Sequence, residues 1–172
     1  MYSFYLPFAL ALLLCGFPIE RNESDPDCYK IARDILVPLG ECSQIQDDHF
    51  FDHYAGTRGQ IGKVGTVTPD IIVDGKKCSW CIETVLAHAN PTQRAILDAN
   101  YGRKESDAEA RVKQVFGEVG VDAFHAQYEA EAYARICVLI DGVPEVKSPC
   151  GGAVLRRAVF RTFLEKIYER TK

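Results

Sequence analysis

Hydrophobic residues recur along most of the chain at the three- and four-residue spacing that is typical of amphipathic α-helices. The main interruption is a segment rich in Gly, Thr and Pro at residues 55–77, which we interpret as a loop. A strand-like patch at residues 70–73 is too short to change the fold class. The pattern predicts an all-α chain with helices at about residues 1–16, 25–54, 79–89, 91–101, 106–117, 121–140 and 153–169.

Residues that favour helix ends occur at several of these boundaries. Asp25 or Asp27 can cap the helix at residues 25–54, and Ser79 can cap the helix that follows the loop. Ser106 precedes Glu109 by three residues, which is the spacing of a capping box. We therefore expect this pair to open the helix at residues 106–117.

The last two predicted helices carry stripes of large side chains, which we interpret as core faces rather than as a ligand pocket. The stripe in the final helix has a spacing of four and consists of Leu155, Val159, Phe163 and Ile167. The stripe in the helix before it consists of Phe124, Tyr128, Tyr133 and Cys137. We expect these side chains to be buried.

A cluster of three carboxylates near the end of the helix at residues 25–54 is the clearest candidate for chemistry. Its members are Asp47, Asp48 and Asp52. Successive helical residues rotate by about 100°, so Asp48 and Asp52 lie about 40° apart, whereas Asp47 and Asp52 lie about 140° apart. We therefore expect Asp48 and Asp52 to bind one metal ion, with Asp47 beside them. A one-residue bulge in the helix would bring Asp47 to the same face.

The residues around this cluster favour a magnesium-bound diphosphate. Mg²⁺ is bound by one or two carboxylates together with substrate phosphates, so its protein ligands are few and acidic. Lys63 and Lys77 in the loop can supply positive charge to the outer phosphate oxygens. A solvated acidic face is the alternative. His49 and His53 are one turn apart, but without further ligands they make a weak zinc site, and a packing role is favoured.

Six blocks of sequence, in the same order, resemble the C-terminal half of the trans-isoprenyl diphosphate synthases, the polyprenyl synthetase family, with farnesyl diphosphate synthases of the fungal type as the nearest group. The blocks are residues 2–7 (YSFYLP), 44–48 (QIQDD), 61–66 (IGKVGT), 77–80 (KCSW), 97–104 (LDANYGRK) and 155–168. Because an Asp-rich triplet alone is weak evidence, the number and order of the blocks carry the resemblance.

The resemblance implies a fold and an activity. The fold is a partial isoprenoid synthase-type helical bundle without its N-terminal helices, and residues 1–172 form the C-terminal portion of a polyprenyl synthetase domain. The activity is Mg²⁺-dependent condensation of isopentenyl diphosphate with dimethylallyl or geranyl diphosphate to farnesyl diphosphate. The allylic diphosphate ionises while Mg²⁺ stabilises the negative charge on the departing diphosphate. The resemblance also implies a homodimer.

Site residues follow from the same resemblance. The implied metal ligands, which match the second Asp-rich motif of the family, are Asp47, Asp48 and Asp52. The residues that match contacts to the allylic diphosphate, or that face the same cavity, are Lys63, Lys77 and Gln44. A basic tail with Arg170 and Lys172 matches a C-terminus that closes over isopentenyl diphosphate. These two charges can alternatively complement the end of the last helix.

The chain departs from the family pattern in four ways. One extra residue separates Asp48 from Asp52, and Ser43 stands where an aromatic residue is usual. Residues 67–69 are additional relative to the family. Nothing in the sequence matches the first Asp-rich motif, the Arg pair that follows it, or the Lys-Thr pair before residue 2. We therefore expect a fragment that is inactive alone, because one wall of aspartates cannot hold the family's trinuclear magnesium cluster.

Three alternatives stay open on the residues alone. A terpene synthase or a longer-chain prenyl synthase on the same scaffold would suit the smaller Ser43 and the altered Asp spacing. A non-catalytic regulatory paralogue is the third, because the first metal motif has no match. Genomic sequence upstream of the Met1 codon would separate an enzyme cut short from a regulatory protein.

Composition adds limits on partners and compartment. The formal net charge of -4 gives no basic face for nucleic acid. Seven cysteines without framework spacing favour a reduced, cytoplasmic protein over a disulfide scaffold. Cys78 and Cys81 form a CxxC pair, and Lys77 with a helix start would lower a thiol pKa there. We nevertheless favour a packing role for the pair.

The apolar run at residues 4–17 resembles a secretory signal, but no Lys or Arg precedes it and no Ala-x-Ala site follows. It is also too short to span a bilayer. We interpret it as a core helix with a bare apolar surface.

Overall fold

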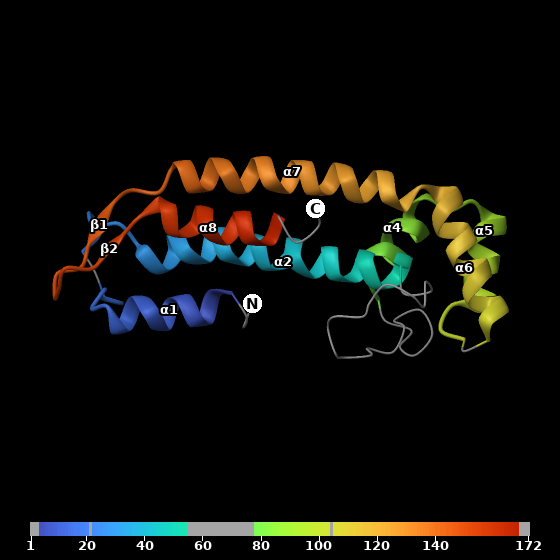
Figure 1. The fold of residues 1–172 in the computed structure, drawn as a ribbon, viewed down its shortest axis with the longest axis horizontal. Helices are drawn as coiled ribbons and strands as arrows, with labels where there is room; N and C mark the ends of the chain where they lie inside the picture. The colour runs from blue at the N-terminus through green and yellow to red at the C-terminus, as the bar shows by residue number, and fades with distance from the viewer. Residues whose placement is uncertain (1–3, 21, 55–77, 104, 169–172) are drawn as a thin grey trace. The chain divides into compact units, whose positions relative to one another are not determined.

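A computed structural model describes residues 4–20, 22–54, 78–103 and 105–168, and these residues are almost entirely helical (Figure 1). The elements are α1 (Tyr5–Leu14), α2 (Cys28–Tyr54), α4 (Trp80–His88), α5 (Pro91–Asn100), α6 (Ser106–Val119), α7 (Val121–Asp141), β1 (Val146–Lys147), β2 (Val154–Leu155) and α8 (Arg157–Tyr168). The predicted all-α fold class is confirmed. The predicted loop at residues 55–77 and its strand-like patch lie outside the described residues.

The chain divides into two compact units, although its length suits one domain. The first unit consists of Met1–Ser43 and Glu129–Lys172, and the second consists of Gln44–Tyr128. Helices α2 and α7 therefore each contribute residues to both units. The acidic cluster belongs to the second unit.

The core of the first unit lies between α2, α7 and α8, with α1 packed on it (Figure 1). On α2 the buried residues recur at spacings of three and four, as expected for one face of a helix. They are Ala32, Ile35, Leu36 and Leu39. Asp27 caps this helix by accepting a hydrogen bond from the backbone N–H of Lys30 at 2.8 Å, which confirms one of the two predicted caps.

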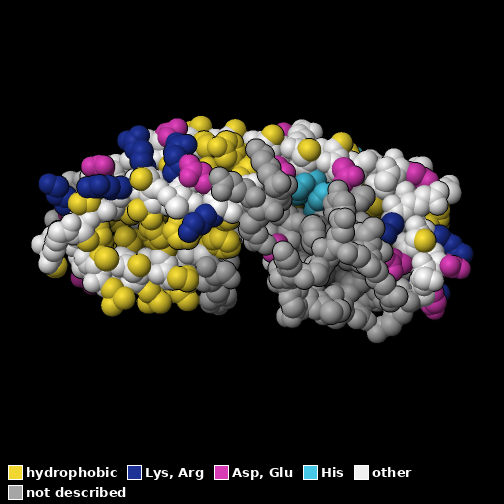
Figure 2. Space-filling model, viewed as in Figure 1, with side chains coloured by type: hydrophobic (Ala, Val, Ile, Leu, Met, Phe, Trp, Pro, Cys, Tyr) yellow, Lys and Arg dark blue, Asp and Glu magenta, His cyan; other side chains and the backbone are white. Residues whose placement is uncertain are grey.

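Helix α1 is apolar on all sides but buries little of its surface. Leu12 is 4% exposed, and Phe8 packs against Phe160 with ring centroids 5.0 Å apart. Four leucines of this helix are exposed, namely Leu6, Leu10, Leu13 and Leu14. Figure 2 shows hydrophobic side chains gathered over this helix. The predicted bare apolar surface is therefore confirmed. Among the described residues, no helix is both long and apolar enough to cross a bilayer.

The start predicted for the last helix, residue 153, is wrong. Val154 and Leu155 form strand β2, which pairs antiparallel with Val146–Lys147, and the helix begins at Arg157. The local pattern favoured a helix because Leu155 continues the four-residue spacing. Pairing with a segment eight residues upstream overrides this local preference for a helix. A strand forms only where a second strand is available to pair with it, and the spacing of residues within one segment does not show whether such a strand exists.

The two predicted stripes are displaced from the true core faces. In α8 the buried side chains are Phe160, Leu164 and Ile167, whereas Val159 and Phe163 are 40% and 37% exposed. In α7 the buried residues of the first unit are Ala132, Ile136 and Ile140, and Tyr133 is exposed. Of the first predicted stripe, Leu155 and Ile167 are buried as expected, whereas Val159 and Phe163 lie beside the buried face. The position of neighbouring helices decides which face is covered.

The second unit has its own core, formed by α4, α5 and α6 with the first residue of α7. Its buried members are Cys81, Ile82, Val85, Leu97, Val112, Val115, Phe116 and Val121. Ser79 caps α4 by accepting a hydrogen bond from the N–H of Ile82, as predicted. The second unit therefore has an apolar core of its own.

The predicted capping box at Ser106 is wrong. Helix α6 has Glu105 as its N-cap, without a side-chain capping bond, so Ser106 is already helical. A capping box does occur at α5, where Asn90 and Gln93 bond each other's backbone N–H at 2.9 Å and 3.0 Å.

Two glycines with a left-handed backbone allow a matched stability test. Gly16 has a φ of 78° and Gly120 a φ of 81°, but a Cβ on Gly16 would lie 2.8 Å from Cβ of Cys150, whereas one on Gly120 meets nothing within 4 Å. We expect Gly120→Ala to cost about 1–2 kcal/mol from backbone strain alone. We expect Gly16→Ala to cost about 1–3 kcal/mol more from overpacking. Urea unfolding measures both, and equal losses would contradict the predicted clash.

Candidate functional site

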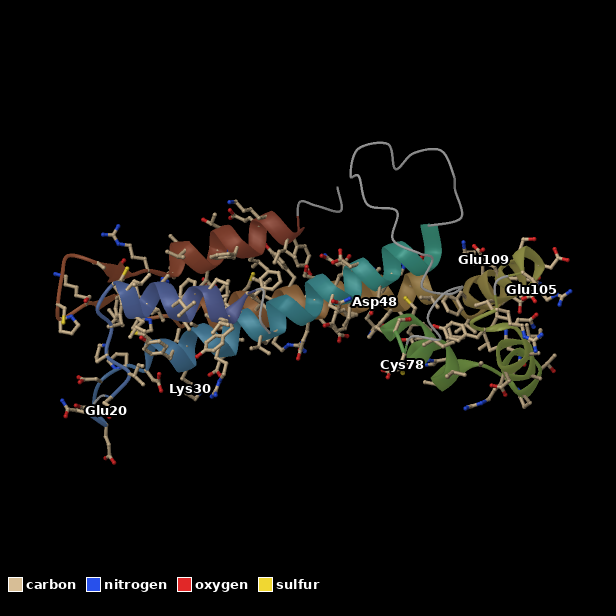
Figure 3. The ribbon with its side chains drawn as sticks, turned by 90° about the horizontal axis from the view of Figure 1, so that it is seen from below. Glu20, Lys30, Asp48, Cys78, Glu105 and Glu109 are labelled. Atoms are coloured by element: carbon tan, nitrogen blue, oxygen red, sulfur yellow. The ribbon has the colours of Figure 1, made fainter. Side chains whose placement is uncertain are left out.

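The backbone of α2 decides the relative orientation of the three aspartates. This helix is α-helical from Cys28 to Tyr54 without interruption, so the bulge that would turn Asp47 toward the face of Asp48 is absent from it. Asp48 and Asp52 are therefore one turn apart on one face. Asp48 is only 6% exposed, and Figure 3 shows it on α2. The side chain of Asp52 lies outside the described residues.

Gln44 contacts the carboxylate of Asp48 directly. Its Nε2 donates to Oδ1 of Asp48 at 2.9 Å, between residues one helical turn apart. Two further polar side chains of this stretch, Ser43 and Gln46, are 5% and 6% exposed. The C-terminal part of α2 thus carries a buried carboxylate among buried polar residues, where an amphipathic helix would ordinarily place apolar ones. Burial of such polar groups costs free energy unless they are hydrogen-bonded, so packing alone does not explain their place in this helix.

His49 packs within the second unit, next to Asp48 in the sequence. Its Nε2 lies 2.8 Å from Oδ1 of Asp122 on α7, and its ring stacks on that of His125 with centroids 3.8 Å apart. Trp80 meets His125 edge-on at 5.9 Å. These contacts give His49 the packing role that the sequence favours over zinc binding. Within the described residues, no group of three or more His, Cys, Asp or Glu could hold a metal ion.

Several predicted site residues lie outside the described part of the chain. They are the loop lysines Lys63 and Lys77 and the tail residues Arg170 and Lys172. Their roles stay predictions.

The CxxC pair has the surroundings of a packing motif. No disulfide joins any of the seven cysteines, all of which are described. The thiol of Cys78, which is labelled in Figure 3, donates to Oε1 of Glu83 at 3.1 Å. This hydrogen bond raises the pKa of Cys78. The sequence predicted that Lys77 and the helix start would lower a thiol pKa in this pair, and for Cys78 this prediction is wrong. Cys78 is exposed but its pKa is raised, and Cys81 is fully buried in the core, so neither thiol is both accessible and readily ionised, as redox chemistry needs.

Removal of the Glu83 carboxylate should make Cys78 more reactive. The hydrogen bond to Glu83 and the negative charge of that residue both raise the thiol pKa, and Glu83→Gln removes the charge and leaves only a neutral acceptor. The substitution should therefore lower the pKa of Cys78 and increase the thiolate fraction at mildly alkaline pH. We expect iodoacetamide to alkylate Cys78 several-fold faster in this variant, as measured by peptide mass spectrometry. Glu105→Gln, an exposed acidic residue elsewhere in the second unit, is the control. Equal rates in both variants would contradict the role of Glu83.

Two hollows in the surface lie along the N-terminal part of α2. One, of about 100 Å³, is lined by Ile31, Asp34, Ile35, Leu139, Gly142 and Val143. The other, of about 430 Å³, is lined by Arg33, Asp34, Val37 and Pro38. Neither includes a residue of the acidic cluster, and their linings carry no set of groups suited to a metal-bound anion. Compared with these two hollows among the described residues, the acidic cluster is the stronger candidate site.

Comparison with known proteins identifies the class. The sequence profile of the polyprenyl synthetase family matches residues 1–119, so the chain belongs to this family. The chain is 49% identical over 173 residues to the farnesyl pyrophosphate synthase of Ganoderma lucidum, covering 99% of this chain and 45% of that protein. It is 45% identical over 171 residues to the Schizosaccharomyces pombe farnesyl pyrophosphate synthase, covering 99% and 44%.

Solved structures agree with the sequence relatives. The crystal structure of Trypanosoma brucei farnesyl diphosphate synthase superimposes with a TM-score of 0.72 at 27% identity, over 98% of this chain and 41% of that one. The chain thus has the fold of part of these proteins. It spans about half the length of the curated relatives it matches.

Two contacts of the site were missed by the sequence interpretation. The bond between Gln44 and Asp48 could have been anticipated, because side chains four residues apart on a helix are neighbours. The pair of His49 and Asp122 joins residues 73 positions apart, and no local spacing signals it. Only the packing of α7 beside the end of α2 in the second unit brings those two side chains together.

Proposed function

We propose that the chain is part of a Mg²⁺-dependent prenyltransferase of the farnesyl diphosphate synthase type. Such an enzyme condenses isopentenyl diphosphate with dimethylallyl or geranyl diphosphate to form farnesyl diphosphate. The observation that carries the proposal is family membership together with 49% identity to a farnesyl pyrophosphate synthase over 99% of this chain. The acidic cluster on α2 supports it, because its oxygen donors suit the cation that such chemistry needs.

The residues of the acidic cluster fit a magnesium site by their donor chemistry. Asp48 is a buried carboxylate whose Oδ1 accepts a hydrogen bond from Gln44, and Asp47 beside it is partly buried. Asp52 would join Asp48 one turn later on the same helix face. Mg²⁺ bound there would stabilise negative charge on a departing diphosphate. The carboxylates would hold the cation and thereby orient the diphosphate that it carries.

The basic residues would bind the rest of the substrates. Lys63 and Lys77 would give ammonium charge to the allylic diphosphate, as point charges that suit phosphate oxygens. Arg170 and Lys172 would close over isopentenyl diphosphate. We propose that the 172-residue chain by itself is inactive, because its sequence provides only one of the two Asp-rich motifs.

A terpene synthase or longer-chain prenyl synthase on the same scaffold is the second candidate. The observation that favours it is Ser43, a small residue that is 5% exposed one position before Gln44, where the family usually has an aromatic side chain. A serine in place of an aromatic side chain would leave a larger cavity, and this cavity would admit a longer or folded prenyl chain.

Product analysis of the full-length enzyme tests the proposal. We expect the purified enzyme with Mg²⁺, isopentenyl diphosphate and dimethylallyl diphosphate to form a C15 diphosphate, identified by chromatography of the dephosphorylated alcohol. Chelation of Mg²⁺ with EDTA should abolish the reaction, and the 172-residue chain alone should show no turnover. A longer or cyclic product would favour the second candidate, and absence of any prenyl transfer would refute both.

We also propose a cytoplasmic homodimer. The absence of disulfides among the seven described cysteines suits a reducing compartment. Light scattering of the full-length enzyme tests the oligomeric state, and a monomer would contradict it.

A further inference from the structure

The hydrogen bond between Gln44 and Asp48 links an exposed amide to a buried carboxylate. Gln44 is exposed, whereas Asp48 is 6% exposed, and Nε2 of Gln44 lies 2.9 Å from Oδ1 of Asp48. An N–H that donates to a carboxylate makes one of the stronger hydrogen bonds in proteins. The bond therefore holds one oxygen of the buried Asp48 carboxylate against the Gln44 amide.

We infer that Gln44 is a positioning residue that orients the Asp48 carboxylate for a divalent cation. The inference rests on the proposed function, since that function requires a cation at Asp48. The terminal torsion of an aspartate is broad, so its two oxygens are poorly fixed by the backbone alone. A bond to Oδ1 favours one rotation about Cβ–Cγ and, together with the other interactions of Asp48, contributes to the direction of Oδ2.

This role differs from the one that the family resemblance implies for Gln44. There Gln44 faces the diphosphate itself, whereas here its amide acts through Asp48. The two roles predict different losses. Removal of a group that orients a metal ligand typically lowers metal affinity 10- to 100-fold. Removal of a direct substrate contact raises the KM for that substrate and leaves metal affinity unchanged.

The chain contains a matched control for the loss of this bond. In α6, Nε2 of Gln114 donates to Oε1 of Glu118 at 2.8 Å, with the same donor, a carboxylate acceptor and the same four-residue spacing. Met has nearly the length of Gln and a good helix propensity but no N–H donor. Gln44→Met and Gln114→Met therefore each remove one glutamine-to-carboxylate bond from a helix surface, and only the first lies beside the acidic cluster.

The test compares both variants in the full-length enzyme. Mn²⁺ alone, titrated and followed by electron paramagnetic resonance, reports cation affinity without turnover. We expect Gln44→Met to weaken Mn²⁺ binding about 10- to 100-fold. It should raise the Mg²⁺ concentration for half-maximal rate to a similar extent, with kcat at saturating Mg²⁺ near that of the parent. Gln114→Met should change neither the Mn²⁺ affinity nor the Mg²⁺ concentration for half-maximal rate. Both variants should unfold at the same temperature.

Two results would overturn the inference. One is Mn²⁺ affinity that is equal in the two variants, and the other is a higher KM for the allylic diphosphate with unchanged Mn²⁺ affinity. Failure of the proposed function is a separate result, because it would leave the parent enzyme without prenyl transfer whatever the Mn²⁺ titration shows. Weakened Mn²⁺ binding in Gln44→Met would support the positioning role even then.

Discussion

Asp48→Asn in the full-length enzyme is expected to reduce kcat/KM for prenyl transfer about 10²- to 10³-fold, which corresponds to roughly 3–4 kcal/mol of transition-state stabilisation. Asparagine keeps the shape of the side chain and can still accept the hydrogen bond of Gln44 through its Oδ1. The change therefore removes the negative charge that would hold Mg²⁺ and little else. Steady-state assays with dimethylallyl and isopentenyl diphosphates measure the loss.

Two companion variants make this prediction specific. Asp34→Asn changes a carboxylate on the same helix whose ion pair with Lys30 is largely exposed, so activity should be unaffected. Asp47→Asn should cost less than Asp48→Asn, because the uninterrupted α2 turns Asp47 away from the face that Asp48 shares with Asp52. A larger loss from Asp47→Asn would show that the face assigned to the metal is wrong.

Phe160→Ala should be the most destabilising single substitution that we propose. Phe160 is fully buried between α1 and the core of the first unit, with its ring 5.0 Å from that of Phe8. Truncation of a buried phenylalanine leaves a cavity and costs about 3–5 kcal/mol. Urea denaturation followed by circular dichroism measures the change in the free energy of unfolding.

Phe163→Ala is the control for this prediction. Its ring also contacts that of Phe8, at 6.2 Å, but the residue is 37% exposed. We expect a loss of about 1 kcal/mol, because much of the side chain is in water before the change and less apolar area is lost. Equal losses from the two variants would mean that the core face of α8 is assigned to the wrong residues.

Local signals explain which predictions of the helix ends succeeded. Asp27 and Ser79 cap their helices as predicted, because a capping side chain bonds a backbone N–H only two or three residues away. The capping box of Asn90 and Gln93 has an equally local pattern and was readable. The choice of Ser106 failed because a backbone bond from Glu109 to the carbonyl of Glu105 starts that helix one residue earlier.

The sequence by itself determined the all-α class, the family, and the placement of Asp48 and Asp52 on one helix face. Each of these depends on composition, motif order or the period of a helix, all of which are properties of neighbouring residues.

Tertiary structure alone decided which faces are buried and which distant residues meet. It buried Phe160 instead of Phe163, paired Leu155 with Val146 as strands, and brought Asp122 to His49. These outcomes depend on where a second segment packs, and the free energy of that packing arises only when both segments leave water together. The periodicity of one segment does not show which other segment will pack against it. A stripe of large side chains can therefore lie at the edge of a core face as readily as at its centre.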